Sequence, residues 1–244
     1  MPAASVDPAE IARFNRLAGE WWDPKGKMAP LHAMNPARLG FIRDEAVKAF
    51  RLDPERIKVL SGLTALDTGC GGGILSEPLA RLGASVTGLD LAEDSLAAAR
   101  AHAAEEGLSI DYRCQAVEEL AASGQRFDLV CALEVVEHVA DLAAFVAAAC
   151  AALKPGGLIV FSTLNRSKRA FAAAIIGAEY LFRWLPKGTH QWEKFVTPDE
   201  LEAALEANGL TVTDERGMVF NPLSGAWRLA DDMAVNYLMA ARKA

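Results

Sequence analysis

The sequence is poor in cysteine and in basic residues. Its 244 residues contain four cysteines: Cys70, Cys114, Cys131 and Cys150. None are spaced as CxxC, and no histidine lies at zinc-finger spacing from them, so we expect reduced thiols in a cytoplasmic protein. Acidic residues outnumber basic ones by 32 to 25, for a net charge of −7. This balance argues against non-specific binding to nucleic acid, because phosphate requires a surplus of Lys and Arg.

Long apolar runs are also missing. No run reaches the roughly 20 residues that a membrane-spanning helix needs. The first residues lack the basic region and apolar stretch of a secretory signal, so we expect none. Hydrophobic residues nevertheless make up 52% of the chain, which excludes disorder of the whole chain and is enough for a full α/β core.

The first 60 residues predict a helical N-terminal cap. A helix is expected over 7–22, where Asp7 can cap the first turn, Pro8 fits it, and Glu10 completes a capping box. A second helix is expected from Asn35-Pro36 to about Phe50. No strong strand pattern precedes residue 61.

Strands and helices alternate from residue 63 onward. The expected strands cover 63–68, 84–90, 109–113, 127–133 and 158–163, and helices over about 74–82, 92–106 and 141–153 separate some of them. This alternation predicts a parallel sheet with helices on both faces. After a helix that Thr197 caps and Gly209 ends, strands over 210–217 and 233–241 are expected to be antiparallel neighbours. We divide the single expected domain into the cap (1–60), a cofactor-binding core (61–163), a lid or membrane-facing insertion (164–196) and a C-terminal helix with a strand pair (197–244).

A glycine-rich turn follows the first strand. In LDTGCGGG, glycines recur at Gly69, Gly71 and Gly73, and Ile74 takes the place of the last glycine of a GxGxxG motif. Glycine lets the backbone turn sharply and approach a ligand. The missing last glycine favours S-adenosylmethionine over a dinucleotide. Alone, the turn could equally be an ordinary strand-to-helix connection.

Two acids strengthen the cofactor hypothesis. Asp67, just before the turn, suits a cationic ligand and would repel phosphates. Asp90, at the end of the next strand, can accept both hydroxyl hydrogens of a ribose. Together they make a nicotinamide dehydrogenase the weaker alternative.

Several segments then identify a family. The segments LDTGCGGG, GLD (88–90), FDLVCALEVVEHV (127–139) and LKPGG (153–157) resemble class I methyltransferases. The narrower resemblance is to the O-methyltransferases of ubiquinone biosynthesis. It rests on FNRLAGEWWDPKGKMAPLHAMNPARLGFI (14–42), FSTLNRSKRA (161–170), GAEYLFRWLPKGTH (177–190) and VNYLMAARK (235–243), and it covers nearly the whole chain.

This resemblance implies a fold, a reaction and partners. The fold is a Rossmann-like α/β domain with a mainly parallel seven-stranded sheet whose last strand is antiparallel. The reaction is methylation by S-adenosyl-L-methionine of phenolic hydroxyls in a polyprenylated catechol and a demethylubiquinol, at both O-methylation steps, with other proteins of the pathway as possible partners. The implied cofactor contacts are Arg38, Gly69, Asp90 and Leu133.

A phenolic acceptor must lose its proton, and the sequence offers two routes. Glu134, Glu137 and His138 follow the fourth expected strand, and their offsets of three and four would place them on one helical face. They could supply a general base or bind Mg²⁺, which some relatives appear to need. They could equally cap the next helix or pack around the cofactor. His190 is a second candidate base, although a plain loop histidine is the stronger interpretation.

Residues 166–187 combine basic ends with an aromatic middle. Five Lys or Arg and one Glu give this segment a charge of +4 within an acidic chain. This pattern predicts a lid helix that lies on an anionic membrane surface, against the alternative of a buried lid. We therefore expect peripheral association with the inner membrane. Other functional interpretations are a methyltransferase of another small or macromolecular substrate and a non-catalytic, lipid-sensing cofactor-binding protein.

Overall fold

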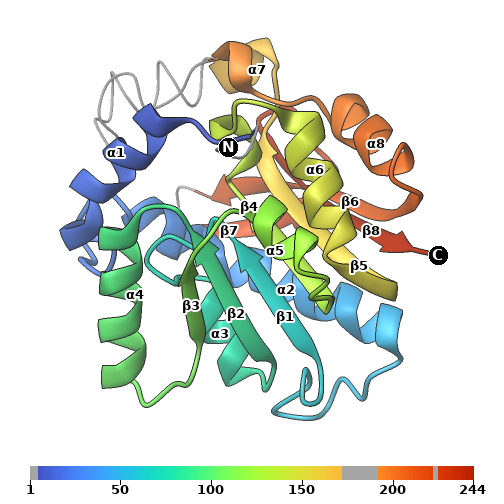
Figure 1. The fold of residues 1–244 in the computed structure, drawn as a ribbon. Helices are drawn as coiled ribbons and strands as arrows, with labels where there is room; N and C mark the ends of the chain where they lie inside the picture. Colours follow the sequence, from blue (N-terminus) through green and yellow to red (C-terminus); the bar gives the residue numbers. More distant parts are fainter. Residues whose placement is uncertain (1–4, 172–191, 222–224) are drawn as a thin grey trace.

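The computed structural model describes residues 5–171, 192–221 and 225–244. One sheet of eight strands forms its centre, in the order β3-β2-β1-β4-β5-β8-β6-β7 (Figure 1). The strands are β1 (Thr64–Thr68), β2 (Ser85–Asp90), β3 (Asp111–Cys114), β4 (Phe127–Leu133), β5 (Leu153–Leu164), β6 (Leu210–Asn221), β7 (Ala226–Ala230) and β8 (Asn236–Lys243). Strands β1 to β5 are parallel, and β8 runs antiparallel between β5 and β6.

The central parallel strands β1, β2, β4 and β5 match the sequence prediction because most of their residues are buried on both faces, whereas the edge strand β3 is largely exposed. In β4, all residues but Asp128 and Leu133 are buried, and β5 is buried from Leu158 to Leu164. Strand β5 begins at Leu153, five residues before the predicted start. Residues 154–157 belong to the strand but form an irregular stretch, in which Gly156 has a φ of 73° and the register with β4 shifts between Phe127 and Leu129.

The C-terminal part contains a strand that the sequence analysis missed. The two predicted strands are present as β6 and β8, and they pair with each other as expected. Strand β7 adds an eighth strand at the edge by pairing with β6. Its burial is only partial, and this half-exposed five-residue segment lacks the long apolar pattern that identified the central strands.

Helices cover both faces of the sheet. One core cluster joins the sheet to α5 (Val117–Ala122), α6 (Leu142–Ala151) and α8 (Pro198–Glu206). A second joins the opposite face to α2 (Ala29–Phe50) and α3 (Ser76–Arg81). Helix α4 (Glu93–Glu105) packs beside β3 at the sheet edge (Figure 1). The short α7 (Lys168–Ala170), which follows β5, and the 3₁₀ turns η2 (Val136–His138) and η4 (Trp192–Lys194) complete the described elements.

The N-terminal cap is helical as predicted, but the predicted bounds of its two helices were wrong. The first helix is split into α1 (Pro8–Arg16) and a 3₁₀ turn, η1 (Ala18–Glu20), and the second starts six residues early, at Ala29. Pro30, and not Pro36, occupies the first turn of α2, where the missing N–H of proline has no helical partner to lose. Pro36, which was expected to open the helix, lies inside it. Among the described residues, no helix is both long and apolar enough to span a membrane.

Candidate functional site

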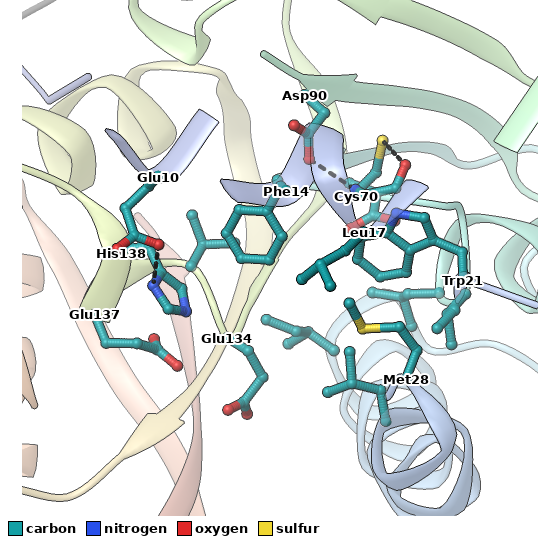
Figure 2. A pocket seen from close by; sticks show the side chains of 18 of the residues that line it. Glu10, Phe14, Leu17, Trp21, Met28, Cys70, Asp90, Glu134, Glu137 and His138 are labelled. Carbon is teal, nitrogen blue, oxygen red and sulfur yellow. Dashed lines mark hydrogen bonds and ion pairs between the residues drawn. The ribbon is translucent and has the colours of Figure 1, made fainter. Parts of the chain in front are cut away.

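A large cavity opens where the parallel strands end. Its volume is about 1620 Å³. The ends of β1, β2 and β4 form one wall. Some of the residues between 5 and 35, in the N-terminal cap, form another. Phe220 and Trp227 from the strand pair at the far edge also line it. Figure 2 shows cap residues such as Phe14 and Trp21 in the same cavity as Asp90 and Glu134.

The glycine-rich turn after β1, here called the cofactor turn (69–75), is held by the neighbouring strand. The backbone N–H groups of Gly69 and Cys70 donate to the Leu89 carbonyl at 2.8 and 2.9 Å. Gly69, Gly71 and Gly73 all have positive φ, a conformation that favours glycine. The turn therefore needs glycine for its backbone path, as the sequence predicted.

The space beside these glycines holds protein side chains, which the sequence analysis did not expect. A Cβ at Gly69 would lie 2.3 Å from Val135 Cγ2, and a Cβ at Gly71 would lie 2.2 Å from the Trp21 ring. Glycine is thus needed here for close packing within the protein as well as for the turn. Gly69, Cys70 and Gly71 still line the cavity with their backbone.

Asp90 lies at the end of β2, beside the cofactor turn. Its Oδ2 accepts from the backbone N–H of Gly71 at 2.8 Å (Figure 2). Its Oδ1 accepts from the backbone N–H of Ala92, also at 2.8 Å. Each carboxylate oxygen can accept a further hydrogen bond. Burial raises the pKa of Asp90, and the backbone hydrogen bonds oppose that rise. The carboxylate is thereby oriented toward the cavity that it lines.

Asp67 is almost fully buried at the base of the turn. Ser76 Oγ donates to its Oδ2 at 2.6 Å. Burial, reinforced by the nearby Asp90 charge, raises the pKa of Asp67 to about 7. A cation bound in the cavity would favour the charged form again, which agrees with the predicted cationic cofactor.

Arg38 extends from α2 into the cavity wall. It is buried, and its Nη2 lies 2.7 Å from Glu134 Oε1. Within the described residues, its buried Nε has no hydrogen-bond partner. A buried guanidinium N–H without a partner suits a carboxylate ligand such as the amino-acid end of the cofactor. Leu133, the last residue of β4, lines the same cavity. Six of the predicted cofactor residues therefore line one cavity whose chemistry fits S-adenosylmethionine: Arg38, Asp67, Gly69, Gly71, Asp90 and Leu133. Gly73 does not line it, because its open side faces Tyr112, whose hydroxyl would lie 2.3 Å from a Cβ there.

The prediction that Glu134, Glu137 and His138 share a helical face is wrong. Glu134 has a positive φ of 54°, and only the three-residue turn η2 follows it. The backbone is not helical at this point because Glu134 directly follows the end of β4, and its N–H still donates to the Ser162 carbonyl of β5. All three side chains nevertheless line the cavity.

These three side chains have different partners. Glu134 accepts from Ser162 Oγ at 2.8 Å and faces Arg38. Glu137 is buried and accepts from Thr163 Oγ1 at 2.8 Å. Burial, together with the Glu134 charge, raises the pKa of Glu137 to about 7.

His138 is paired with the N-terminal cap instead. Its Nδ1 lies 3.1 Å from Glu10 Oε2, and its ring packs edge-on against Phe14 (Figure 2). The hydrogen bond with His138 lowers the pKa of Glu10. Sequence analysis singled out Glu10 only as a helix cap, because spacing along the chain cannot show a contact 128 residues away.

The described part of the chain contains no group of three or more His, Cys, Asp and Glu side chains arranged to bind a metal. The predicted Mg²⁺ ligands do not fit a common ion, since each is engaged by a different partner. His190, the other candidate base, lies outside the described residues.

Comparison with known proteins adds independent findings. Residues 11–215 match a family model described as a methyltransferase domain. The chain is 57% identical over 239 residues to the ubiquinone biosynthesis O-methyltransferase of Methylobacterium sp. (strain 4-46), covering 98% of this chain and 96% of that protein. It is 56% identical over 240 residues to the enzyme of the same name from Rhodopseudomonas palustris (strain BisB5), covering 98% and 94%.

Solved structures share the fold at much lower sequence identity. An S-adenosylmethionine-dependent methyltransferase from Clostridium acetobutylicum ATCC 824 has a TM-score of 0.65 at 15% identity, covering 95% of this chain and 99% of that one. Magnesium protoporphyrin IX methyltransferase from Synechocystis PCC 6803, solved with bound SAM, has a TM-score of 0.61 at 19% identity, covering 99% of both chains. These similarities confirm the predicted Rossmann-like methyltransferase fold.

Proposed function

Because the chain belongs to the family of ubiquinone biosynthesis O-methyltransferases, we propose that it methylates phenolic hydroxyls of polyprenylated catechol and demethylubiquinol intermediates, at both O-methylation steps. One observation carries the proposal. A single cavity joins the buried Asp67 and the partly buried Asp90 at one wall to an aromatic wall with Phe220 and Trp227 at another. The first wall suits a cationic nucleoside, and the second suits an apolar ring.

The cofactor, when bound, supplies an electrophilic methyl group on a sulfonium. Asp90 would accept the ribose hydroxyls, Arg38 would bind the carboxylate, and Asp67 would favour the positive charge. Methyl transfer is an in-line displacement, so alignment of the two reactants contributes most of the rate. The cap closes one side of the cavity and limits the water around the reacting groups.

His138 is our choice as the base that takes the phenolic proton. A neutral imidazole that donates its Nδ1–H to Glu10 leaves Nε2 free to accept a proton. Glu10 then orients the ring and stabilises the imidazolium that forms, as a carboxylate does beside a catalytic histidine. This arrangement requires no metal step.

A methyl-transfer assay tests the function. The enzyme is incubated with labelled S-adenosylmethionine and a short-chain prenylated catechol, with and without a chelator. We expect label in the phenolic ether in both arms. If no phenolic acceptor gains label, the proposed reaction is wrong; if only the chelator arm fails, the metal-free route is wrong.

Two variants test the assignment of His138 as the base that takes the phenolic proton. His138→Gln keeps a similar size but cannot take up the proton, so kcat should fall about 10²- to 10⁴-fold. Glu10→Gln should lower kcat less, because the ring keeps a neutral partner. Equal kcat values for His138→Gln and the parent enzyme would refute this role.

We also propose that residues 166–187 bind an anionic membrane surface, which would bring the head group of a polyprenyl substrate to the cavity. Most of this segment lies outside the described residues. At its start, Arg166 pairs with Glu200 and Arg169 with Asp232. These internal ion pairs leave the remaining basic residues as the better candidates for lipid contact.

Co-sedimentation with vesicles tests the membrane proposal. The parent chain should sediment with phosphatidylglycerol vesicles and much less with phosphatidylcholine ones. The variant Lys168→Glu/Arg183→Glu/Lys187→Glu should lose this binding, and high salt should weaken the parent's binding. Arg216→Glu, outside the segment, is the matched control. Unchanged sedimentation of the triple variant would contradict the proposal.

A further inference from the structure

A cluster of ring side chains contacts the cofactor turn at Gly72. Trp22, just after η1, donates its Nε1–H to the Gly72 carbonyl at 3.0 Å. Gly69, Cys70 and Gly71 face the cavity from the same turn, whereas neither Gly72 nor Trp22 is among the described residues that line it. Trp22 therefore contacts the turn outside the cavity lining.

The Trp22 ring is itself fixed between two histidines. It stacks on His102 of α4 with ring centroids 3.5 Å apart and planes only 2° from parallel. His32 of α2 meets it edge-on, with centroids 5.2 Å apart. A ring packed on a face and along an edge has few other rotamers available, so its N–H points steadily at Gly72.

His102 is fixed by a buried acid. Its Nδ1 lies 2.6 Å from Glu77 Oε1, and the other Glu77 oxygen pairs with Arg81 at 3.0 Å. Glu77 is fully buried and belongs to the first turn of α3, directly after the cofactor turn. The contacts thus form a chain that runs from Glu77 in α3, through His102 and Trp22, to Gly72 in the cofactor turn.

We propose that Trp22 and His102 are positioning residues that hold the cofactor turn in its binding conformation and so set the affinity for S-adenosyl ligands. The Gly72 carbonyl lies in a turn, where no helical N–H is available to it, and Trp22 supplies the donor. Fixing the turn before the ligand arrives reduces the ordering cost of binding. The inference rests on cofactor binding at this turn and is independent of the acceptor substrate.

Calorimetric titration with S-adenosylhomocysteine tests the proposal. Trp22→Phe keeps an aromatic ring but lacks the donor, and the loss of one hydrogen bond should raise Kd about five-fold. The KM for S-adenosylmethionine should rise by a similar factor, while kcat at saturating cofactor stays near that of the parent. A parent-like Kd in a folded Trp22→Phe variant would overturn the proposal.

A matched pair at position 102 isolates the stacking. His102→Ala and His102→Phe both lose the bond to Glu77, but only Phe keeps a ring against Trp22. We expect a weaker Kd for the Ala variant and recovery toward the parent value in the Phe variant. Equal Kd values in the two variants would refute the role of the stack, and this pair leaves Trp22 in place should Trp22→Phe not fold.

Two further measurements separate positioning from general destabilisation. Trp192 donates its N–H to the Ser167 carbonyl and lies outside the cavity lining, so Trp192→Phe removes a comparable bond and should leave Kd unchanged. The double variant Trp22→Phe/His102→Ala should raise Kd by less than the product of the two single effects, because both act through one contact. If the Kd of the double variant rose by the full product of the two single effects, the proposed chain of contacts from His102 through Trp22 to Gly72 would be contradicted.

Discussion

At the scale of single residues, Asp67 shows how burial changes the chemistry of an acid. Burial, with a contribution from the nearby Asp90 charge, raises its pKa from 3.8 to about 7 in the ligand-free chain. The folded state therefore binds a proton that the unfolded state releases between pH 4 and 7. The free energy of unfolding contributed by this group falls as pH rises through that window.

Asp67→Asn should remove this loss of stability at higher pH. Asn is neutral at every pH and can still accept from Ser76. The free energy of unfolding of the variant relative to the parent should therefore increase by about 2 kcal/mol from pH 5 to pH 8. Urea unfolding at both pH values measures the change. Asp128→Asn is the control. Hydrogen bonds from Lys154 and Thr64 outweigh burial and lower the pKa of Asp128, so this substitution should change the free energy of unfolding equally at pH 5 and pH 8. A pH-independent effect of Asp67→Asn would contradict the raised pKa.

At the scale of elements, α8 is a helix whose start the sequence predicted correctly. Thr197 Oγ1 accepts from the Glu200 N–H at 3.3 Å, and Glu200 Oε2 accepts from the Thr197 N–H at 3.0 Å. This capping box is entirely local, so four consecutive residues encode it. The helix buries Leu201 and Leu205 against the sheet.

Thr197→Ala should destabilise the protein by about 1 kcal/mol, because the first turn loses the side-chain acceptor for one N–H. Thr197→Ser keeps that acceptor and should remain close to the parent. Chemical denaturation measures both variants. Binding of S-adenosylhomocysteine should not change in either, since this helix does not line the cavity; equal stability of the Ala variant and the parent would show that the cap contributes nothing.

At the scale of the whole molecule, the cavity joins segments that are far apart in sequence. The N-terminal cap, the ends of the parallel strands and the C-terminal strand pair all line it. A ligand that contacts the cap and the core stabilises the folded state as a unit.

S-adenosylhomocysteine at 100 times its Kd should add about 2.7 kcal/mol of stability. For a chain of this size, that corresponds to a rise in Tm of about 5 to 11 °C. Differential scanning calorimetry measures the shift, and limited proteolysis should show slower cleavage within residues 5–28. Asp90→Asn, which replaces a carboxylate oxygen by a donor, should show a much smaller shift at the same ligand concentration. A cap cleaved equally fast with and without ligand would argue against its role as a cavity wall.

The parallel core and the cofactor turn could be predicted because their signals are local. Continuous apolar runs identify strands buried on both faces, and the glycines with Asp67 and Asp90 mark the strand ends. The capping box at Thr197 is equally local. The half-exposed β7 was missed because it carries no such pattern.

The partners of the site residues could not be predicted in this way. The sequence by itself determined the alternation of strands and helices and the position of the glycine turn, since period and backbone preference act over a few neighbouring residues. Only the tertiary structure decided that Glu134 faces Arg38, that His138 faces Glu10 and that Trp22 holds Gly72. These pairs are separated by 50 to 128 residues, and they meet because the cap folds back over the carboxyl ends of the strands.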